Sequence, residues 1–115
     1  MKRFFVLICC CLLSLLLPAA TAHATVDLEL GAKTFKGNCV GCHIGGKNTL
    51  VATKNLSLEA LHEYHMDTPE AIIAQVTNGK AAMPAFKSRL KPDEIESVAA
   101  YVLDQAQKGW GKKTA

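Results

Sequence analysis

The sequence predicts a small all-α domain of four short helices joined by loops. Three observations support this class. Apolar residues recur every three or four positions in several segments, which places them on one face of a helix. Proline, glycine and capping residues stand where such helices should begin and end, and no alternation of strand and helix patterns is present. The chain is also short enough for a single domain.

The first helix is expected at about positions 27–36. Asp27 would lie in its first turn, where a carboxylate meets the positive end of the helix dipole. Gly31 and Phe35 are four residues apart and therefore share a face. We expect Gly37 to end this helix, and a long loop to follow from about position 45 to 55.

The second and third helices begin at recognisable capping residues. Ser57 can accept a hydrogen bond from a free backbone N–H, and the helix it caps should run through Tyr64. Thr68 suits the N-cap of the third helix, and Pro69 suits its first position, where no N–H is needed. Gly79 supplies a left-handed stop.

The fourth helix has the clearest pattern. Pro92 opens it, although Lys91 stands where a capping Ser or Asp is commoner. Its apolar stripe should face the first helix, with Tyr101 near the crossing and Gly31 allowing close approach, so that the N- and C-terminal helices pack together. The stripe consists of Ile95, Val98, Ala99, Val102, Leu103 and Ala106.

The most informative motif lies between the first two helices. Cys39 and Cys42 are separated by two residues and are followed directly by His43, which is the attachment sequence of a c-type haem. Each thiol can add to one vinyl group of the porphyrin, and the imidazole then binds the iron from one face. A dithiol redox motif or half of a zinc site is the alternative, but residues 25–115 contain no further cysteine.

The first 24 residues read as a cleaved secretory signal peptide. Lys2 and Arg3 precede an apolar run from Phe4 to Leu17, which is shorter than the about 20 residues that span a bilayer. The sequence Ala-His-Ala at 22–24 offers a cleavage site, and an uncleaved anchor is the alternative. We therefore expect an exported domain at residues 25–115 that is not integral to a membrane. Export agrees with covalent haem attachment, which takes place outside the cytoplasm.

Charge excludes one class of partner. Without Lys2 and Arg3 the chain carries 11 Lys and Arg against 10 Asp and Glu, a formal charge of +1. Two haem propionates would bring this to about −1. No basic stripe of the kind that nucleic acid requires is present.

The sixth iron ligand separates an electron carrier from a site that binds small molecules. Met83 stands before Pro84, which keeps it out of helical geometry, and we expect its thioether to be the second axial ligand. Met66 is interpreted as packing. His62 and His65, three apart on the second helix, are interpreted as surface residues. With both axial positions of the iron filled by side chains, we do not expect catalysis. We expect a one-electron carrier with a high reduction potential.

With these residues in place, the chain resembles the cytochrome c6 family, the small class I cytochromes c of cyanobacterial and algal photosynthesis. The resemblance covers nearly all of residues 26–110. The Asn-Gly-Lys-x-Ala-Met-Pro segment at 78–84 is its most specific part, because the attachment motif alone indicates only a c-type cytochrome. The other matching segments are residues 27–32, 37–43, 45–48, 75–86 and 99–102.

The resemblance implies a class I cytochrome c fold and a place for the protein in photosynthesis. It implies that cytochrome b6f is the electron donor and photosystem I the acceptor, in the thylakoid lumen or the periplasm. Gln75 matches a family glutamine near the haem that helps to keep the reduction potential high. Arg89 matches an arginine that docks on photosystem I.

Two other functions remain open at this point. The carrier could donate to a terminal oxidase, because that role demands the same haem. A haem-based ligand sensor or peroxidase, in which Met83 leaves the iron, is the alternative of another class.

Overall fold

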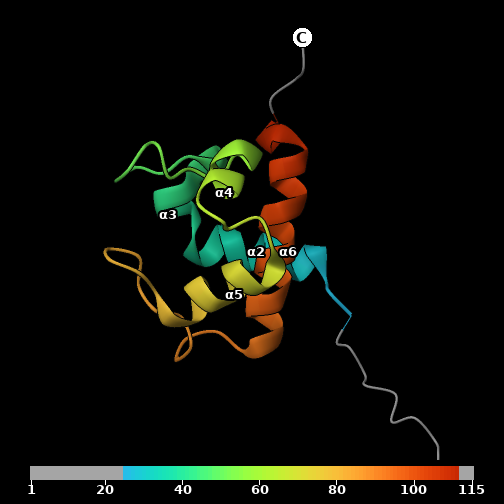
Figure 1. Cartoon of the computed structure of the whole chain (residues 1–115). Coiled ribbons are helices and arrows are strands. Elements are labelled where there is room, and N and C mark those ends of the chain that lie inside the picture. Colours follow the sequence, from blue (N-terminus) through green and yellow to red (C-terminus); the bar gives the residue numbers. More distant parts are fainter. Residues whose placement is uncertain (1–24, 112–115) are drawn as a thin grey trace, which may run out of the picture.

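The structure is a computed structural model that describes residues 25–111, so the predicted signal peptide at 1–24 lies outside the described residues. The predicted all-α class is confirmed: the described part of the chain forms helices and loops without a strand (Figure 1). The α-helices are α2 (Leu28–Asn38), α3 (Val40–His43), α4 (Leu58–Glu63), α5 (Pro69–Asn78) and α6 (Pro92–Gln107), with 3-10 turns η2 (Ile44–Gly46) and η3 (Gly109–Gly111).

Helix α2 begins and ends later than the sequence predicts. Asp27 is its N-cap rather than a member of its first turn, and its carboxylate accepts from the N–H groups of Glu29 and Leu30 at 2.9 and 3.0 Å. Gly37 does not end the helix. The N–H of Cys39 still donates to the carbonyl of Phe35 at 2.9 Å, so the helical hydrogen bonds run up to the attachment motif. Gly37 does not have the positive φ with which a glycine commonly ends a helix.

Helix α4 ends one residue earlier than predicted, in a Schellman motif. Its start is confirmed, since the hydroxyl of Ser57 accepts from a backbone N–H. At its end the N–H of His65 donates to the carbonyl of His62 at 3.1 Å, and that of Met66 to Leu61 at 2.7 Å. His65 occupies the left-handed position of this motif with φ of 55°. His62 and His65 therefore do not share a helix, contrary to the prediction.

The predicted limits of α5 are confirmed. The hydroxyl of Thr68 accepts from the N–H of Ala71 at 3.3 Å, and Pro69 occupies the first turn. Gly79 ends the helix with φ of 70°, and its N–H donates to the carbonyl of Gln75 at 2.7 Å.

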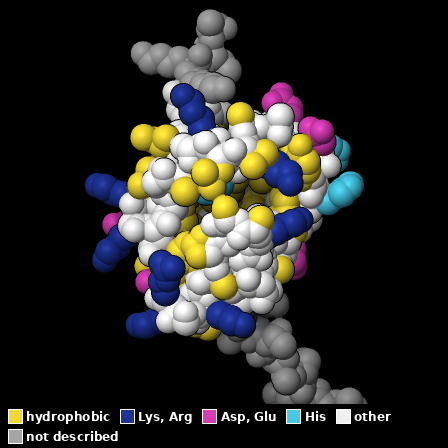
Figure 2. All heavy atoms as spheres, turned by 90° about the vertical axis from the view of Figure 1, so that its left-hand side faces the viewer, with side chains coloured by type: hydrophobic (Ala, Val, Ile, Leu, Met, Phe, Trp, Pro, Cys, Tyr) yellow, Lys and Arg dark blue, Asp and Glu magenta, His cyan; other side chains and the backbone are white. Residues whose placement is uncertain are grey.

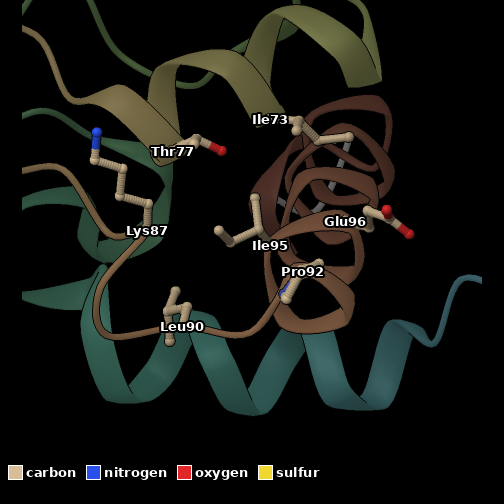
Figure 3. Close-up of a pocket in the computed structure, with 7 residues that line it drawn as sticks. All are labelled: Ile73, Thr77, Lys87, Leu90, Pro92, Ile95 and Glu96. Carbon is tan, nitrogen blue, oxygen red and sulfur yellow. The ribbon is translucent and has the colours of Figure 1, made fainter.

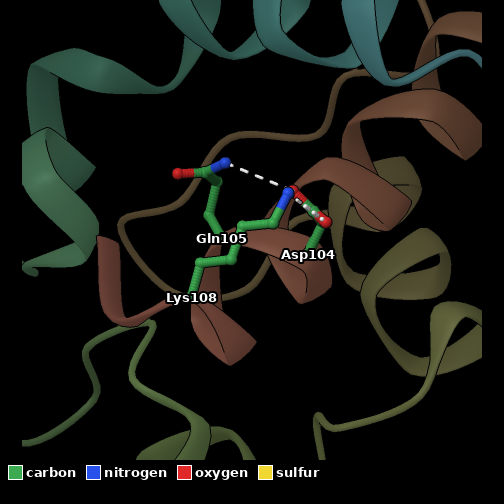
Figure 4. Close-up of polar contacts among 3 residues, drawn as sticks. All are labelled: Asp104, Gln105 and Lys108. Carbon is green, nitrogen blue, oxygen red and sulfur yellow. Dashed lines mark hydrogen bonds and ion pairs between the residues drawn. The ribbon is translucent and has the colours of Figure 1, made fainter. Parts of the chain in front are cut away.

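Helix α6 is capped by its own first turn. The backbone N–H of Lys91 donates to the carboxylate of Glu94 at 2.8 Å, which is the N3-to-N-cap half of a capping box. At the other end, Lys108 lies 2.8 Å from the carboxylate of Asp104, and the amide of Gln105 donates to the same carboxylate (Figure 4). Both ends of the longest helix thus have polar partners.

The predicted crossing of the first and last helices is confirmed, and α2 lies across α6 (Figure 1). A Cβ added at Gly31 would overlap the carbonyl oxygen of Ser97 and lie 2.7 Å from the Cβ of Tyr101. Val98 and Ala99 of α6 are almost completely buried at this level. The hydrophobic core therefore sits between α2, α5 and α6.

Trp110 fastens the end of the described chain to the loop after the attachment motif. Its indole N–H donates to the carbonyl of Leu56 at 2.8 Å, and its ring occupies the space a side chain at Gly46 would need. The ring centroid lies 5.2 Å from that of Phe35. Across residues 25–111, every helix is too short or too polar to cross a bilayer.

Candidate functional site

One face of the molecule is hollowed by a cavity of about 400 Å³. The cavity lies between the α2–α3 corner, the loop 47–56, helices α4 and α5, and the segment 80–86. Apolar side chains gather around the hollow, with Lys and Arg around them (Figure 2). Cys39, Cys42, His43, Met66, Gln75, Met83 and Arg89 all line this cavity. The fold thus brings every predicted site residue to one place.

The two thiols are positioned by helix α3. The N–H groups of Cys42 and His43 donate to the carbonyl of Cys39 at 3.2 and 3.0 Å, so the three side chains leave a single helical turn. Cys39 is half-buried and Cys42 is exposed. Burial raises the pKa of the Cys39 thiol to about 11, and this thiol is therefore neutral at physiological pH.

A backbone carbonyl orients the ring of His43. Nδ1 lies 3.0 Å from the carbonyl oxygen of Lys47, an acceptor that requires the proton to be on Nδ1. Gly45 and Gly46 have φ of 58° and 76°, and this pair turns the chain so that the carbonyl comes back to the imidazole. In the neutral ring with this tautomer, the lone pair of Nε2 is available to a metal.

The thioether of Met83 is held by a tight turn and by a side chain of α5. Lys80 and Met83 exchange two backbone hydrogen bonds, each 3.0 Å long. The amide nitrogen of Gln75 lies 3.6 Å from the sulfur of Met83. The N–H of Phe86 then donates to the carbonyl of Val76 at 2.9 Å and returns the chain to α5. A soft, neutral donor is thereby fixed in the cavity wall.

Among the other candidate donors, only Met66 also lines the cavity. Met66 is half-buried, packs against the hydrophobic core and lines the cavity. His62 and His65 are exposed and do not line it. His62 Nδ1 instead lies 2.9 Å from the carboxylate of Asp67. The hydrogen bond from His62 lowers the pKa of that carboxyl below its usual range.

The charge at the cavity has one sign. Lys54, Lys80 and Arg89 line it, and no carboxylate of residues 25–111 does. The Lys54 ammonium lies 5.5 Å from the centre of the Tyr64 ring, and the Arg89 guanidinium lies 5.3 Å from that of Phe86. No role was predicted from the sequence for Lys54 or Lys80, although Lys80 belongs to the Asn-Gly-Lys-x-Ala-Met-Pro segment. Only the folded chain brings them together.

A second, smaller cavity of about 190 Å³ lies elsewhere, between α5, α6 and the segment that joins them (Figure 3). Its walls are mainly apolar, with one lysine and one glutamate, and contain no thiol, imidazole or thioether. It is lined by Ile73, Thr77, Lys87, Leu90, Pro92, Ile95 and Glu96. This cavity therefore has none of the donors that the attachment motif calls for.

The donor set of the larger cavity fits a covalent haem. It offers two thiols, an imidazole with a free nitrogen, a thioether, apolar walls for a porphyrin and cations for its two carboxylates. A zinc site would need at least three Cys, His or carboxylate ligands together, and residues 25–111 contain no such group. The zinc alternative therefore has no support in the described part of the chain.

Known proteins agree with this fit. A family model described as "Cytochrome C oxidase, cbb3-type, subunit III" matches residues 26–102. Cytochrome c6 of Thermosynechococcus vestitus is 50% identical over 110 residues, covering 96% of this chain and 98% of its own. Cytochrome c6 of Parathermosynechococcus lividus is 57% identical over 84 residues, covering 73% of this chain and 97% of its own.

Solved structures show the same fold. Cytochrome c6 from the diatom Phaeodactylum tricornutum superposes with a TM-score of 0.71 at 49% identity, covering 73% of this chain and 99% of that one. The chain belongs to the cytochrome c6 family of photosynthetic electron carriers, which hold a covalently bound haem c.

Proposed function

We propose that this protein carries single electrons from cytochrome b6f to photosystem I. Cys39 and Cys42 form the thioether bonds to the haem, and His43 and Met83 are its axial ligands. When bound, the haem supplies an iron that accepts and releases one electron. Residues of the cavity wall hold that group and adjust its reduction potential.

Each of the two axial side chains has a polar partner that suits this role. The hydrogen bond to the carbonyl of Lys47 keeps the proton of His43 on Nδ1 and increases the basicity of the other nitrogen. Gln75 donates to the sulfur of Met83, which withdraws electron density from the thioether and favours the reduced metal. We therefore expect a high reduction potential.

The same arrangement supports a carrier rather than an enzyme. With both axial positions taken by side chains of the protein, an external substrate must displace one of them to react. The tight turn at 80–83 and the hydrogen bond from Gln75 oppose displacement of Met83. Carbon monoxide should therefore not bind promptly to the ferrous protein at neutral pH, whereas a ligand sensor or a peroxidase would bind it.

The surroundings of the cavity suit a brief encounter with an acidic partner. Leu50 and Val51 line the cavity and are 65% and 45% exposed, so an apolar surface adjoins the three cations. Apolar contact without a large buried interface allows rapid release, and charge speeds the encounter. We place the mature protein in the thylakoid lumen or the periplasm, after removal of residues 1–24.

The main observation behind this proposal is that the attachment motif and the Gln75–Met83 pair line the same cavity. Flash photolysis of isolated photosystem I with the reduced protein tests the acceptor. The proposal predicts photo-oxidation of the haem at a rate that rises with protein concentration. Oxidation by a purified terminal oxidase, with no response to light and photosystem I, would instead assign the protein to respiration.

A further inference from the structure

The turn that carries Met83 contains an alanine in an unfavourable backbone conformation. Among residues 25–111, positive φ outside glycine occurs only at His65, Ala81 and Trp110. Ala81 has φ of 52°. In this region the Cβ of an L-residue is crowded by its own backbone, and Gly, Asn, Asp and His are the residues that accept it most readily.

The hydrogen bonds of the turn impose this conformation. Lys80 and Met83 exchange both of their backbone hydrogen bonds at 3.0 Å, which leaves only two residues, Ala81 and Ala82, to reverse the chain. Two-residue turns that join such a hydrogen-bonded pair favour a positive φ at their first central residue. Ala81 has this φ in the closed turn.

Ala81 and Ala82 are both exposed and both line the cavity, so packing of the methyl group does not set the two positions apart. The turn is held closed from its two ends. Gly79 packs so tightly that an added Cβ would lie 2.6 Å from the nitrogen of Ala85, and the N–H of Phe86 is bonded to Val76. The strain at Ala81 thus opposes contacts made elsewhere.

We infer that Ala81 is a positioning residue that works against the closed turn and sets how readily Met83 yields its place to a small neutral nitrogen base. The inference rests on the proposed role of Met83 as axial ligand. Opening the turn breaks the Lys80–Met83 hydrogen bonds and relieves the φ of Ala81 at the same time. In the exchange, one iron–sulfur bond breaks and one iron–nitrogen bond forms, with no change in oxidation state.

A pair of matched substitutions tests this inference. Ala81→Gly and Ala82→Gly make the same chemical change at neighbouring exposed positions, but only Ala81 has a positive φ. At both positions glycine gives the open turn more conformational freedom, and at Ala81 it also removes the strain of the closed turn, which is the larger effect. Imidazole affinity of the ferric holoprotein should fall about threefold in Ala81→Gly and rise about threefold in Ala82→Gly.

The spectrum and a third variant separate strain from a general loss of structure. The sulfur-to-iron charge-transfer band should disappear as imidazole binds, and its loss should follow the same binding curve. Ala81→Asn accepts a positive φ without the added freedom of glycine, so it should lower imidazole affinity as Ala81→Gly does. These results together would support the inference.

Two other results would overturn it, and they can be told apart. If Ala81→Gly and Ala82→Gly shift imidazole affinity in the same direction while the charge-transfer band is present and is lost on binding, Met83 is the ligand but Ala81 carries no strain that matters. If the wild-type protein has no such band and binds imidazole as tightly as Met83→Ala, the proposed ligation itself is wrong, and the inference fails with it.

Discussion

A polar group lies beside each of the two predicted axial ligands, His43 and Met83. The carbonyl of Lys47 fixes the imidazole, and the amide of Gln75 meets the thioether. The sequence predicted both donors and also Gln75, by resemblance to the family. It did not predict the contact of Lys47, because a backbone carbonyl has no side-chain signal. The glycine pair at 45–46 was the only sequence feature that indicated a turn of the chain at this point.

Gln75 tests whether its amide tunes the thioether. Gln75→Leu removes the hydrogen bond at 3.6 Å, so the sulfur donates more strongly to the oxidised metal. A hydrogen bond worth about 1 kcal/mol corresponds to a fall in reduction potential of about 40 mV for one electron. Spectroelectrochemical titration measures the reduction potential of the variant. Gln107→Leu, on the exposed end of α6, serves as the control. An equal shift in both variants would refute the tuning role.

The lowered pKa of Asp67 leads us to expect that the free energy of unfolding depends on pH. Its pKa is lowered by the hydrogen bond from His62, and a carboxyl of lowered pKa stabilises the fold above its unfolded pKa and ceases to do so as the pH falls through its folded pKa. Asp67→Asn should therefore lower the urea midpoint slightly at about pH 6, and this loss should diminish as the pH is lowered through the acidic range. Glu63→Gln, at the exposed end of α4, serves as control. A loss that stays the same as the pH is lowered would contradict the assignment.

At the scale of elements, capping residues and apolar periodicity predicted four of the helices, and tertiary contacts decided their ends. Helix α2 runs past Gly37 because that glycine does not take a positive φ, and α4 stops at Glu63 because His65 does. Neither choice is visible in a single sequence, since glycine and histidine are each compatible with both conformations. Helix ends were accordingly the least predictable part of the fold.

Two glycines of α2 test the crossing with α6. Gly31→Ala forces a Cβ against Ser97 and Tyr101, and we expect a loss of about 1–3 kcal/mol in the free energy of unfolding. Gly37→Ala meets no atom within 4 Å and should stabilise the protein by about 0.5–1 kcal/mol, because alanine favours the helix. Chemical denaturation of both holoproteins measures the difference. Equal effects would show that the helices do not cross closely at Gly31.

At the scale of the whole molecule, the fold collects three cations around one cavity from two connections of the chain, the loop before α4 and the connection between α5 and α6. Lys54 comes from the loop before α4, Lys80 from the turn after α5 and Arg89 from the segment before α6. Net charge close to zero gave no indication of this asymmetry. The sequence could predict the cofactor from five adjacent residues, but the charged surface exists only in the folded chain.

Arg89 tests the direction of electrostatic steering. Arg89→Gln removes a cation at the cavity, so the second-order rate of photosystem I reduction should fall severalfold at low salt and converge with wild type at high salt. Lys108→Gln is the control, since Lys108 is paired with Asp104 and does not line the cavity (Figure 4). Equal slowing by both variants would indicate an effect of total charge rather than of this surface.

Axial ligation of the haem by Met83 is the central claim, and the near-infrared spectrum of the oxidised protein tests it most directly. A sulfur-to-iron charge-transfer band should be present in the wild-type protein and absent from Met83→Ala, whose reduction potential should also be lower. Met66→Ala removes the other thioether of the cavity wall and should keep the band. A spectrum that Met83→Ala leaves unchanged would contradict the assignment of this ligand.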